Sequence, residues 1–303
     1  MTLVCIGDEY GRLGNRLVRA AHVLAFCREW NFAFLDLPFA PYANNLATSA
    51  SSIALSSPRV PVPSVVARRL HQRLAFHGPR VAHRISQVPT IGPLVRRFVH
   101  NVTLPAGDRI DLSRPELADE FQRYRIVVLR GWYFRCYSLV QAHADWLRTF
   151  LRPNISESDR ACQSIRQSRA AGRFVVGVHI RGGDYRTWRE GRFFYPLDFY
   201  LKQMRIAAFE LASQDVKFLI SSDEAIDQSQ LNEFDCILTD GNIVSDLAAL
   251  SHCDMIFGPP SSFSLWASFL GQVDLWHMTS PDETFSFDCF SQSSDLNWVL
   301  EQQ

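Results

Sequence analysis

From Phe174 onwards, short apolar runs alternate with segments of helical periodicity. The apolar runs are predicted to be strands over residues 174–178, 216–220, 237–238, 255–257 and 273–276. Helical patterns lie between them, at about residues 197–212, from Asp223, at 244–251 and at 263–270. Short strands that are apolar on both faces are typical of a parallel sheet covered by helices on each side. The sequence therefore predicts a doubly wound α/β domain in this half of the chain.

The beginning of the chain has the same character. A strand over residues 3–6, a glycine-rich loop from Gly7 to Gly14, a helix from Asn15 to Trp30 and a strand over 32–35 form a predicted βαβ unit. A further strand is predicted at 125–129 and a helix at about 138–151. With a break near residues 152–154, we expect an N-terminal α/β domain over residues 1–155 and a C-terminal Rossmann-like domain over residues 156–303.

The strongest functional signal is the segment HIRGGDY, from His179 to Tyr185, directly after a predicted buried strand. Ligands bind at the carboxyl ends of strands in open α/β sheets. Arg181 has the fork geometry for bidentate phosphate binding, and Gly183 permits a close approach by a ligand. The alternative is that Arg181 forms an ordinary surface ion pair with Asp184.

A second signal is GPPSSFS, residues 258–264, between a predicted strand and a predicted helix. Ser261, Ser262 and the amides at the start of this helix are suited to bind an anion. The alternative is that one serine only caps the helix. Asp246 has two interpretations as well, since it either offsets a helix dipole or accepts two N–H groups from guanine. Asp223 either caps the next helix or lines the ligand site.

The first loop, GDEYGRLGN, matches neither GxGxxG nor GxxxxGK[ST]. Asn15 either caps the following helix or, with Gly14, touches the phosphates or sugar of a donor.

The formal net charge is zero, which argues against a general nucleic-acid binder. Residues 37–107 nevertheless lack any acid and carry many arginines, within a predicted basic helical insertion at about 58–100. This segment is a solvated basic face, a site for an anionic acceptor, or a contact with an acidic membrane surface. The seven cysteines form no CxxC pair and predict free thiols in a reducing compartment. We expect a cytoplasmic protein, with peripheral contact at the inner membrane face through the arginine-rich segment.

Together these segments resemble the α1,2-fucosyltransferase family, within the superfamily of GDP-fucose-dependent fucosyltransferases. The resemblance rests on GRLGNRLVRAAHVLAF, LRGWYFRCYSLV, VVGVHIRGGDY, FLISSDEAI and DLAALSHCDMIFGPPSSFSLWASFLG, in that order. It implies a GT-B-like fold of two facing Rossmann-like domains with a donor cleft between them. By this resemblance residues 1–155 would form the acceptor side and residues 156–303 would bind the nucleotide sugar. It also implies inverting, metal-independent transfer of fucose from GDP-fucose to a hydroxyl of a glycan or glycolipid, with no cofactor besides the GDP-sugar substrate.

The resemblance also implies roles for single residues. Arg181 would hold the β-phosphate, and His179 and Asp246 would contact the guanine nucleoside. The remaining donor-binding candidates would be Gly183, Asp184, Asp223, Ser261, Ser262 and Phe263, with Gly14 and Asn15 from the other domain. Candidates for the acceptor base are Asp8, Glu9 and Asp36.

The chain departs from the family pattern at several positions. Gly182 replaces a frequent second arginine, Pro260 a frequent asparagine, and Arg16 a common glutamine. Two alternatives therefore stay open, namely a transferase of the same fold with another nucleotide sugar, and an inactive relative that binds a glycan or a protein.

Overall fold

The computed structural model describes residues 1–47, 55–56, 97–157 and 159–297. It divides into two compact units, which we call unit 1 (Met1–Asn154) and unit 2 (Ile155–Gln303). The predicted basic helical insertion lies, except for its last residues, outside the described residues, as do the alternatives proposed for it.

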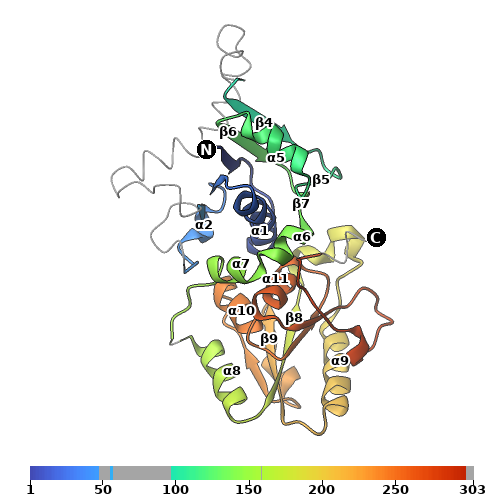
Figure 1. Cartoon of the computed structure of the whole chain (residues 1–303). Helices are drawn as coiled ribbons and strands as arrows, with labels where there is room; N and C mark the ends of the chain where they lie inside the picture. The colour runs from blue at the N-terminus through green and yellow to red at the C-terminus, as the bar shows by residue number, and fades with distance from the viewer. Residues whose placement is uncertain (48–54, 57–96, 158, 298–303) are drawn as a thin grey trace. The chain divides into compact units, whose positions relative to one another are not determined.

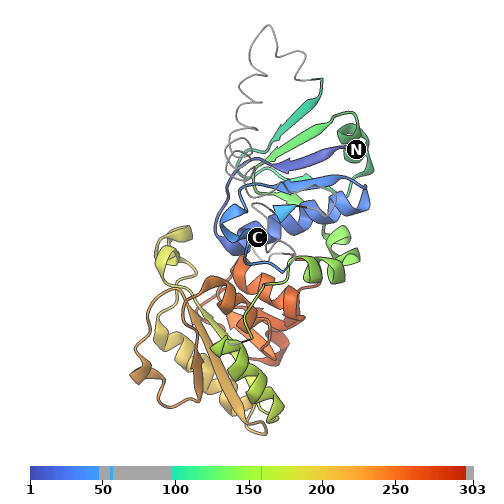
Figure 2. The same ribbon diagram turned by 90° about the vertical axis from the view of Figure 1, so that its left-hand side faces the viewer.

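Unit 1 contains a five-stranded sheet in the order β3-β2-β1-β6-β4. Only β3 runs antiparallel to its neighbour. Figure 2 shows β4, β6, β1 and β2 side by side above the long helix α1. The strands are β1 (Leu3–Ile6), β2 (Ala33–Asp36), β3 (Leu55–Ser56), β4 (Val99–Thr103) and β6 (Ile126–Arg130). The three strands predicted from apolar runs in this unit are therefore confirmed.

The helices of unit 1 differ from the predictions at their ends. Helix α1 (Leu13–Glu29) begins two residues earlier than predicted, so Gly14 belongs to its first turn and not to the preceding loop, and Asn15 lies inside the helix and does not cap it. The single helix expected over 138–151 is interrupted at His143. The other elements are α2 (Ala40–Ala43), α5 (Pro115–Gln122), α6 (Tyr137–Ala142), α7 (Ala144–Phe150), and a small sheet of β5 (Ile110–Asp111) and β7 (Phe134–Arg135).

Unit 2 contains a six-stranded sheet in the order β10-β9-β8-β11-β12-β13, parallel except for β13. The strands are β8 (Phe174–Ile180), β9 (Val216–Ser222), β10 (Cys236–Leu238), β11 (Met255–Gly258), β12 (Asp274–His277) and β13 (Ser291–Gln292). Each predicted strand is present, and the doubly wound arrangement is confirmed. Because the chain moves from β8 first to β9 and later to β11, the strand order reverses between β8 and β11.

The helices of unit 2 are α8 (Arg160–Ala170), α9 (Leu197–Glu210), α10 (Ile243–Leu250) and α11 (Ser262–Gly271), with short 3₁₀ turns η1 (Gly183–Arg186), η2 (Trp188–Gly191), η3 (Gln228–Leu231) and η4 (Phe287–Cys289). Figure 1 shows β8 and β9 between α9 on one side and α8 and α10 on the other. The prediction of a helix from Asp223 is wrong, because only the short turn η3 forms there. The segment after β9 is mostly polar and lacks the apolar period that would hold a helix on the sheet.

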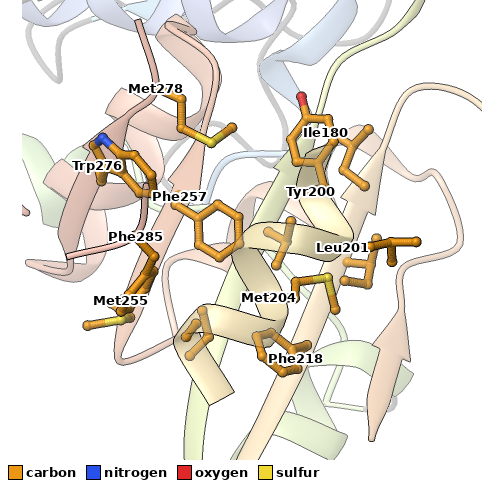
Figure 3. Close-up of a cluster of buried hydrophobic side chains, with 14 of the residues drawn as sticks. Ile180, Tyr200, Leu201, Met204, Phe218, Met255, Phe257, Trp276, Met278 and Phe285 are labelled. Atoms are coloured by element: carbon orange, nitrogen blue, oxygen red, sulfur yellow. The ribbon is translucent and has the colours of Figure 1, made fainter. Parts of the chain in front are cut away.

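The core of unit 2 holds β8, β9 and β11 beneath α9. Figure 3 shows Tyr200, Leu201 and Met204 of α9 against Phe218 of β9 and Phe257 of β11. These side chains are buried, so the three strands are fixed relative to one another. The carboxyl ends of these strands, where the predicted ligand residues lie, are therefore held in fixed positions by the core.

All seven cysteines are free, five of them buried, while Cys236 is half-buried and Cys289 is exposed. No group of three or more His, Cys, Asp or Glu side chains within the described residues is arranged to hold a metal ion. In the same part of the chain, no helix has both the length and the apolar character to cross a membrane.

Candidate functional site

The site candidate in unit 2 lies where the strand order reverses, at the carboxyl ends of β8 and β11. The loops that leave these two strands are joined, because the hydroxyl of Tyr185 donates to the carbonyl of Pro260 at 2.6 Å. The ring of His179 lies 5.2 Å from the ring of Phe263. A Cβ atom on Gly258 would lie 2.5 Å from the carbonyl oxygen of His179, so glycine permits this close approach. The structure thus brings the HIRGGDY and GPPSSFS segments together.

Arg181 is held by two carboxylates. Its Nη1 lies 2.8 Å from Oδ2 of Asp223, and its Nη2 donates to Oδ1 of Asp184. The guanidinium also lies over the ring of Tyr185, 4.9 Å from the centroid, and 14% of the Arg181 side chain remains exposed. Asp223 further accepts from the backbone N–H of Gly182 at 2.8 Å, so it fixes this turn and does not cap a helix. The pair with Asp184, expected as an alternative, is present.

Glu224 is a residue of this turn that sequence reasoning missed. Its Oε1 accepts from the backbone N–H of Gly183 at 2.8 Å, and its Oε2 pairs with Arg186 at 2.8 Å. A Cβ atom on Gly182 would lie 2.2 Å from the Glu224 carboxylate, so Glu224 occupies the space beside this glycine. The only signal in the sequence is its place directly after Asp223, which lies at the carboxyl end of the neighbouring strand.

The start of α11 forms the other side of the site. Ser261 caps the helix, because its hydroxyl oxygen accepts from the backbone N–H of Phe263 at 3.2 Å. The first turn carries no acidic residue, so no side chain of the helix offsets the positive end of its dipole. Ser264 bonds to the ring of His277, and burial lowers the pKa of His277 to about 4. Ser261 therefore has the capping role that was one of the two interpretations. The helix end that it caps is also suited to bind an anion.

His179 and Asp246 are both buried beside this edge. Burial, reinforced by the charge of Arg181, lowers the pKa of His179 well below its usual value, so the ring is neutral near pH 7. Its Nδ1 is buried without a hydrogen-bond partner. Asp246 lies in the first turn of α10, where Asn242 caps the helix, and it accepts from the hydroxyl of Ser221 at 3.5 Å. Burial raises the pKa of Asp246 to about 6.

The three base candidates lie in unit 1 and differ in exposure. Asp36 is buried, accepts from the backbone N–H of Phe39 at 3.0 Å, and has its pKa raised to about 7 by burial. Asp8 is tied to Arg19, with 2.8 Å between Nη1 and Oδ1. Glu9 has a side chain that is 54% exposed and a longer contact of 3.5 Å with Arg16.

The fold is shared with known enzymes. A variant of the fucosyltransferase FUT1 from Arabidopsis thaliana, solved in complex with GDP, is 12% identical, with a TM-score of 0.57 over 96% of this chain and 73% of that chain. The fucosyltransferase NodZ from Bradyrhizobium is 17% identical, with a TM-score of 0.53 over 93% of this chain and 97% of that chain. NodZ, an α1,6-fucosyltransferase, has also been solved after soaking with GDP-fucose. None of the curated proteins compared with the chain matches it.

These matches show the fold, which has parallel α/β sheets of the kind found in GT-B fucosyltransferases. The model of glycosyl transferase family 11 matches residues 118–302, more than half of the chain. The chain therefore belongs to glycosyl transferase family 11, a family of fucosyltransferases, and the predicted family and fold class are confirmed.

Proposed function

We propose that the protein transfers fucose from GDP-fucose to a hydroxyl of a glycan or glycolipid, with inversion and without a metal. The observation that carries this proposal is the convergence at the β8–β11 switch point, where Arg181, His179 and the start of α11 meet. Ligands of open α/β sheets bind at such a point. Relatives of the same fold have been solved with GDP and with GDP-fucose, which supports GDP-fucose as the donor.

In the proposed complex the diphosphate lies between Arg181 and the amino end of α11. Ser261 and Ser262 would bond the phosphates, and Phe263, with neutral His179, would pack against the nucleoside. Gly183 would allow the close approach, and Asp184 and Asp223 would aim the guanidinium. Gly14 and Asn15 of unit 1 are proposed to contact the donor as well. No cofactor takes part in this scheme.

The chemistry requires charge stabilisation and a base. As the bond from the sugar to the β-phosphate breaks, negative charge grows on the departing GDP, and the fixed guanidinium of Arg181 would stabilise it. Glu9 is the favoured base, because a base must reach the acceptor hydroxyl and its carboxylate is the most exposed of the three candidates. Burial raises the pKa of Asp36 to about 7 but also keeps this carboxyl group away from solvent, and Asp8 already binds Arg19.

The donor is tested by binding. At millimolar concentration we expect GDP to raise the melting temperature of the protein, because a ligand that binds only the folded state stabilises it. UDP and ADP should raise it less, because they lack the donor edge of guanine that Asp246 would read. A larger shift with UDP or ADP would assign another nucleotide sugar, and no shift with any of them would contradict the proposed donor site.

GDP affinity should fall as the solution is acidified. An ionised Asp246 accepts the N–H donors of guanine, whereas a protonated one does not, and burial raises its pKa to about 6. Affinity should therefore be greatest above pH 7 and weaken by up to about tenfold per pH unit below pH 6. Titration calorimetry between pH 5 and pH 8 measures this dependence. The Asp246→Asn variant should bind GDP more weakly, and its GDP affinity should no longer depend on pH in this range. If the pH dependence were unchanged in this variant, Asp246 would be excluded as the titrating group.

One observation favours a second candidate, a relative that binds glycans without turnover. Arg181 is neutralised by Asp184 and Asp223, and Glu224 adds a further carboxylate beside Gly182. Hydrolysis of GDP-fucose by the wild type, lost on removal of Arg181, would support the enzyme. Glycan binding without any GDP release would support the second candidate.

The proposal places the protein in the cytoplasm, with contact at the inner membrane face through the arginine-rich segment. The free state of all seven cysteines supports a reducing compartment. We also propose that residues 1–155 supply the acceptor side and residues 156–303 the nucleotide-sugar side. Fractionation of the producing cell tests the location, because recovery outside the cytoplasm and its membrane would contradict it.

A further inference from the structure

Unit 1 has a topological switch point of its own. From β1 the chain moves to β2 on one side and later to β6 on the other, and both pair with β1 in parallel. The loops that leave β1 and β6 therefore diverge at the same edge of the sheet, where open α/β sheets bind ligands. The donor site proposed above is built at the switch point of unit 2 and includes from unit 1 only Gly14 and Asn15 of α1, so the loops that leave β1 and β6 have no role in donor binding.

The two loops at this edge are tied together by a buried arginine. Arg19 donates to Oδ1 of Asp8 at 2.8 Å, to the carbonyl of Asp8 at 2.7 Å and to the carbonyl of Gly131 at 3.0 Å. Asp8 in turn accepts from the backbone N–H of Gly131 at 2.9 Å. Charge-assisted hydrogen bonds of a buried guanidinium are among the stronger polar contacts in proteins. The loop after β1 is thus fixed against the loop after β6.

Two stacked aromatic rings belong to these two fixed loops. The ring of Tyr10 is stacked on the ring of Trp132, with 4.7 Å between centroids and 12° between planes. Trp132 is buried, and the guanidinium of Arg135 lies 4.4 Å from its ring while donating to its carbonyl at 2.9 Å. Tyr10 itself is 42% exposed although the stack covers one side of its ring. A rigid aromatic surface is therefore presented to solvent at the switch point.

The groups beside this stack favour a neutral sugar as its ligand. An aromatic face carries negative charge density and attracts the weakly positive C–H face of a pyranose. Glu9, next to Tyr10 in sequence and half exposed, accepts hydrogen bonds from hydroxyl groups. A nucleotide base would also stack on this ring, but the proposed function already assigns the nucleotide to the switch point of unit 2, and the carboxylates of Asp8 and Glu9 are paired with Arg19 and Arg16.

We propose that Tyr10, stacked on Trp132, binds a pyranose ring of the acceptor glycan, with Glu9 beside its hydroxyl groups. This inference rests on the proposed function, since it supposes transfer to a sugar hydroxyl. It adds a specificity-determining residue, Tyr10, whose neighbour in the sequence is the favoured base.

The test compares Tyr10→Ala, Tyr10→Phe and the matched control Phe209→Ala, which truncates an aromatic side chain that is 78% exposed at the end of α9. Saturation-transfer NMR measures binding of methyl β-galactopyranoside, methyl β-glucopyranoside and methyl α-mannopyranoside. Transfer to the glycoside that binds best gives the acceptor KM. We expect Tyr10→Ala to lose the NMR signal and to raise this KM by roughly tenfold. Tyr10→Phe and Phe209→Ala should behave as wild type.

The outcomes separate this inference from the donor proposal. GDP binding and GDP-fucose hydrolysis without acceptor should be unchanged in Tyr10→Ala, and their absence in the wild type would count against the donor proposal alone. The inference would be overturned by a Tyr10→Ala variant that keeps the glycoside signal, or by a wild type that binds none of the three glycosides. It would also be overturned if Tyr10→Ala lost GDP binding in parallel, because the role of Tyr10 would then be structural.

Discussion

Replacement of Arg181 by alanine is expected to lower kcat/KM for GDP-fucose by about 10²- to 10³-fold. The structure fixes this guanidinium at the end of β8, with Asp184 and Asp223 as its supports. Its contribution is greatest in the transition state, when the leaving diphosphate gains charge. The loss should therefore appear in kcat as well as in GDP affinity. Steady-state kinetics with detection of released GDP measures both.

Two variants serve as controls for this result. Arg205→Ala removes an exposed arginine that pairs with Glu233 at 2.5 Å in the same unit, and it should leave kcat/KM within about twofold. Arg181→Lys keeps the charge but loses the fork geometry, so it should recover only part of the activity. If Arg181→Ala retained the activity of Arg205→Ala at an unchanged melting temperature, the proposed role of Arg181 would be wrong.

Replacement of Phe257 by alanine is expected to lower the free energy of unfolding by about 3–5 kcal/mol. Phe257 is fully buried in β11, with the rings of Trp276 and Phe285 at 6.0 and 6.3 Å. A cavity at this point would sit directly beneath the loop that carries Ser261. Denaturant titration followed by circular dichroism measures the change.

Phe209→Ala is again the matched control, since its ring is largely exposed and its loss should change stability by less than about 0.5 kcal/mol. Equal losses for the two variants would show that Phe257 does not lie in the core that supports the switch point. A stable Phe257→Ala protein with normal GDP binding would lead to the same conclusion.

The fold of unit 2 was predictable because its strands are apolar on both faces. Runs such as 174–178 and 255–257 have that character, whereas the order of the strands in the sheet is known only from the structure. Strand β4 was missed because Val99–Thr103 contains His100, Asn101 and Thr103 and is only partly buried. The prediction of a helix from Asp223 was wrong because the residues after β9 are mostly polar and give a helix no apolar face to pack on the sheet.

The candidate site was only partly predictable. Glycine-rich and serine-rich turns after buried strands indicated Arg181 and Ser261 from local sequence alone. The supports of Arg181 come from a different strand, and nothing in the sequence gives the distance of 2.8 Å between Arg181 and Asp223. The same holds for Tyr10 and Trp132, which lie far apart in the chain and meet only because β1 pairs with β6.

A crystal structure with GDP bound tests the central claim most directly. We expect the β-phosphate to lie within hydrogen-bond distance of Arg181 and of the first turn of α11, with the guanine against Phe263 and Asp246. The claim would be contradicted if GDP were bound at another place and Arg181 kept only its ion pairs with Asp184 and Asp223.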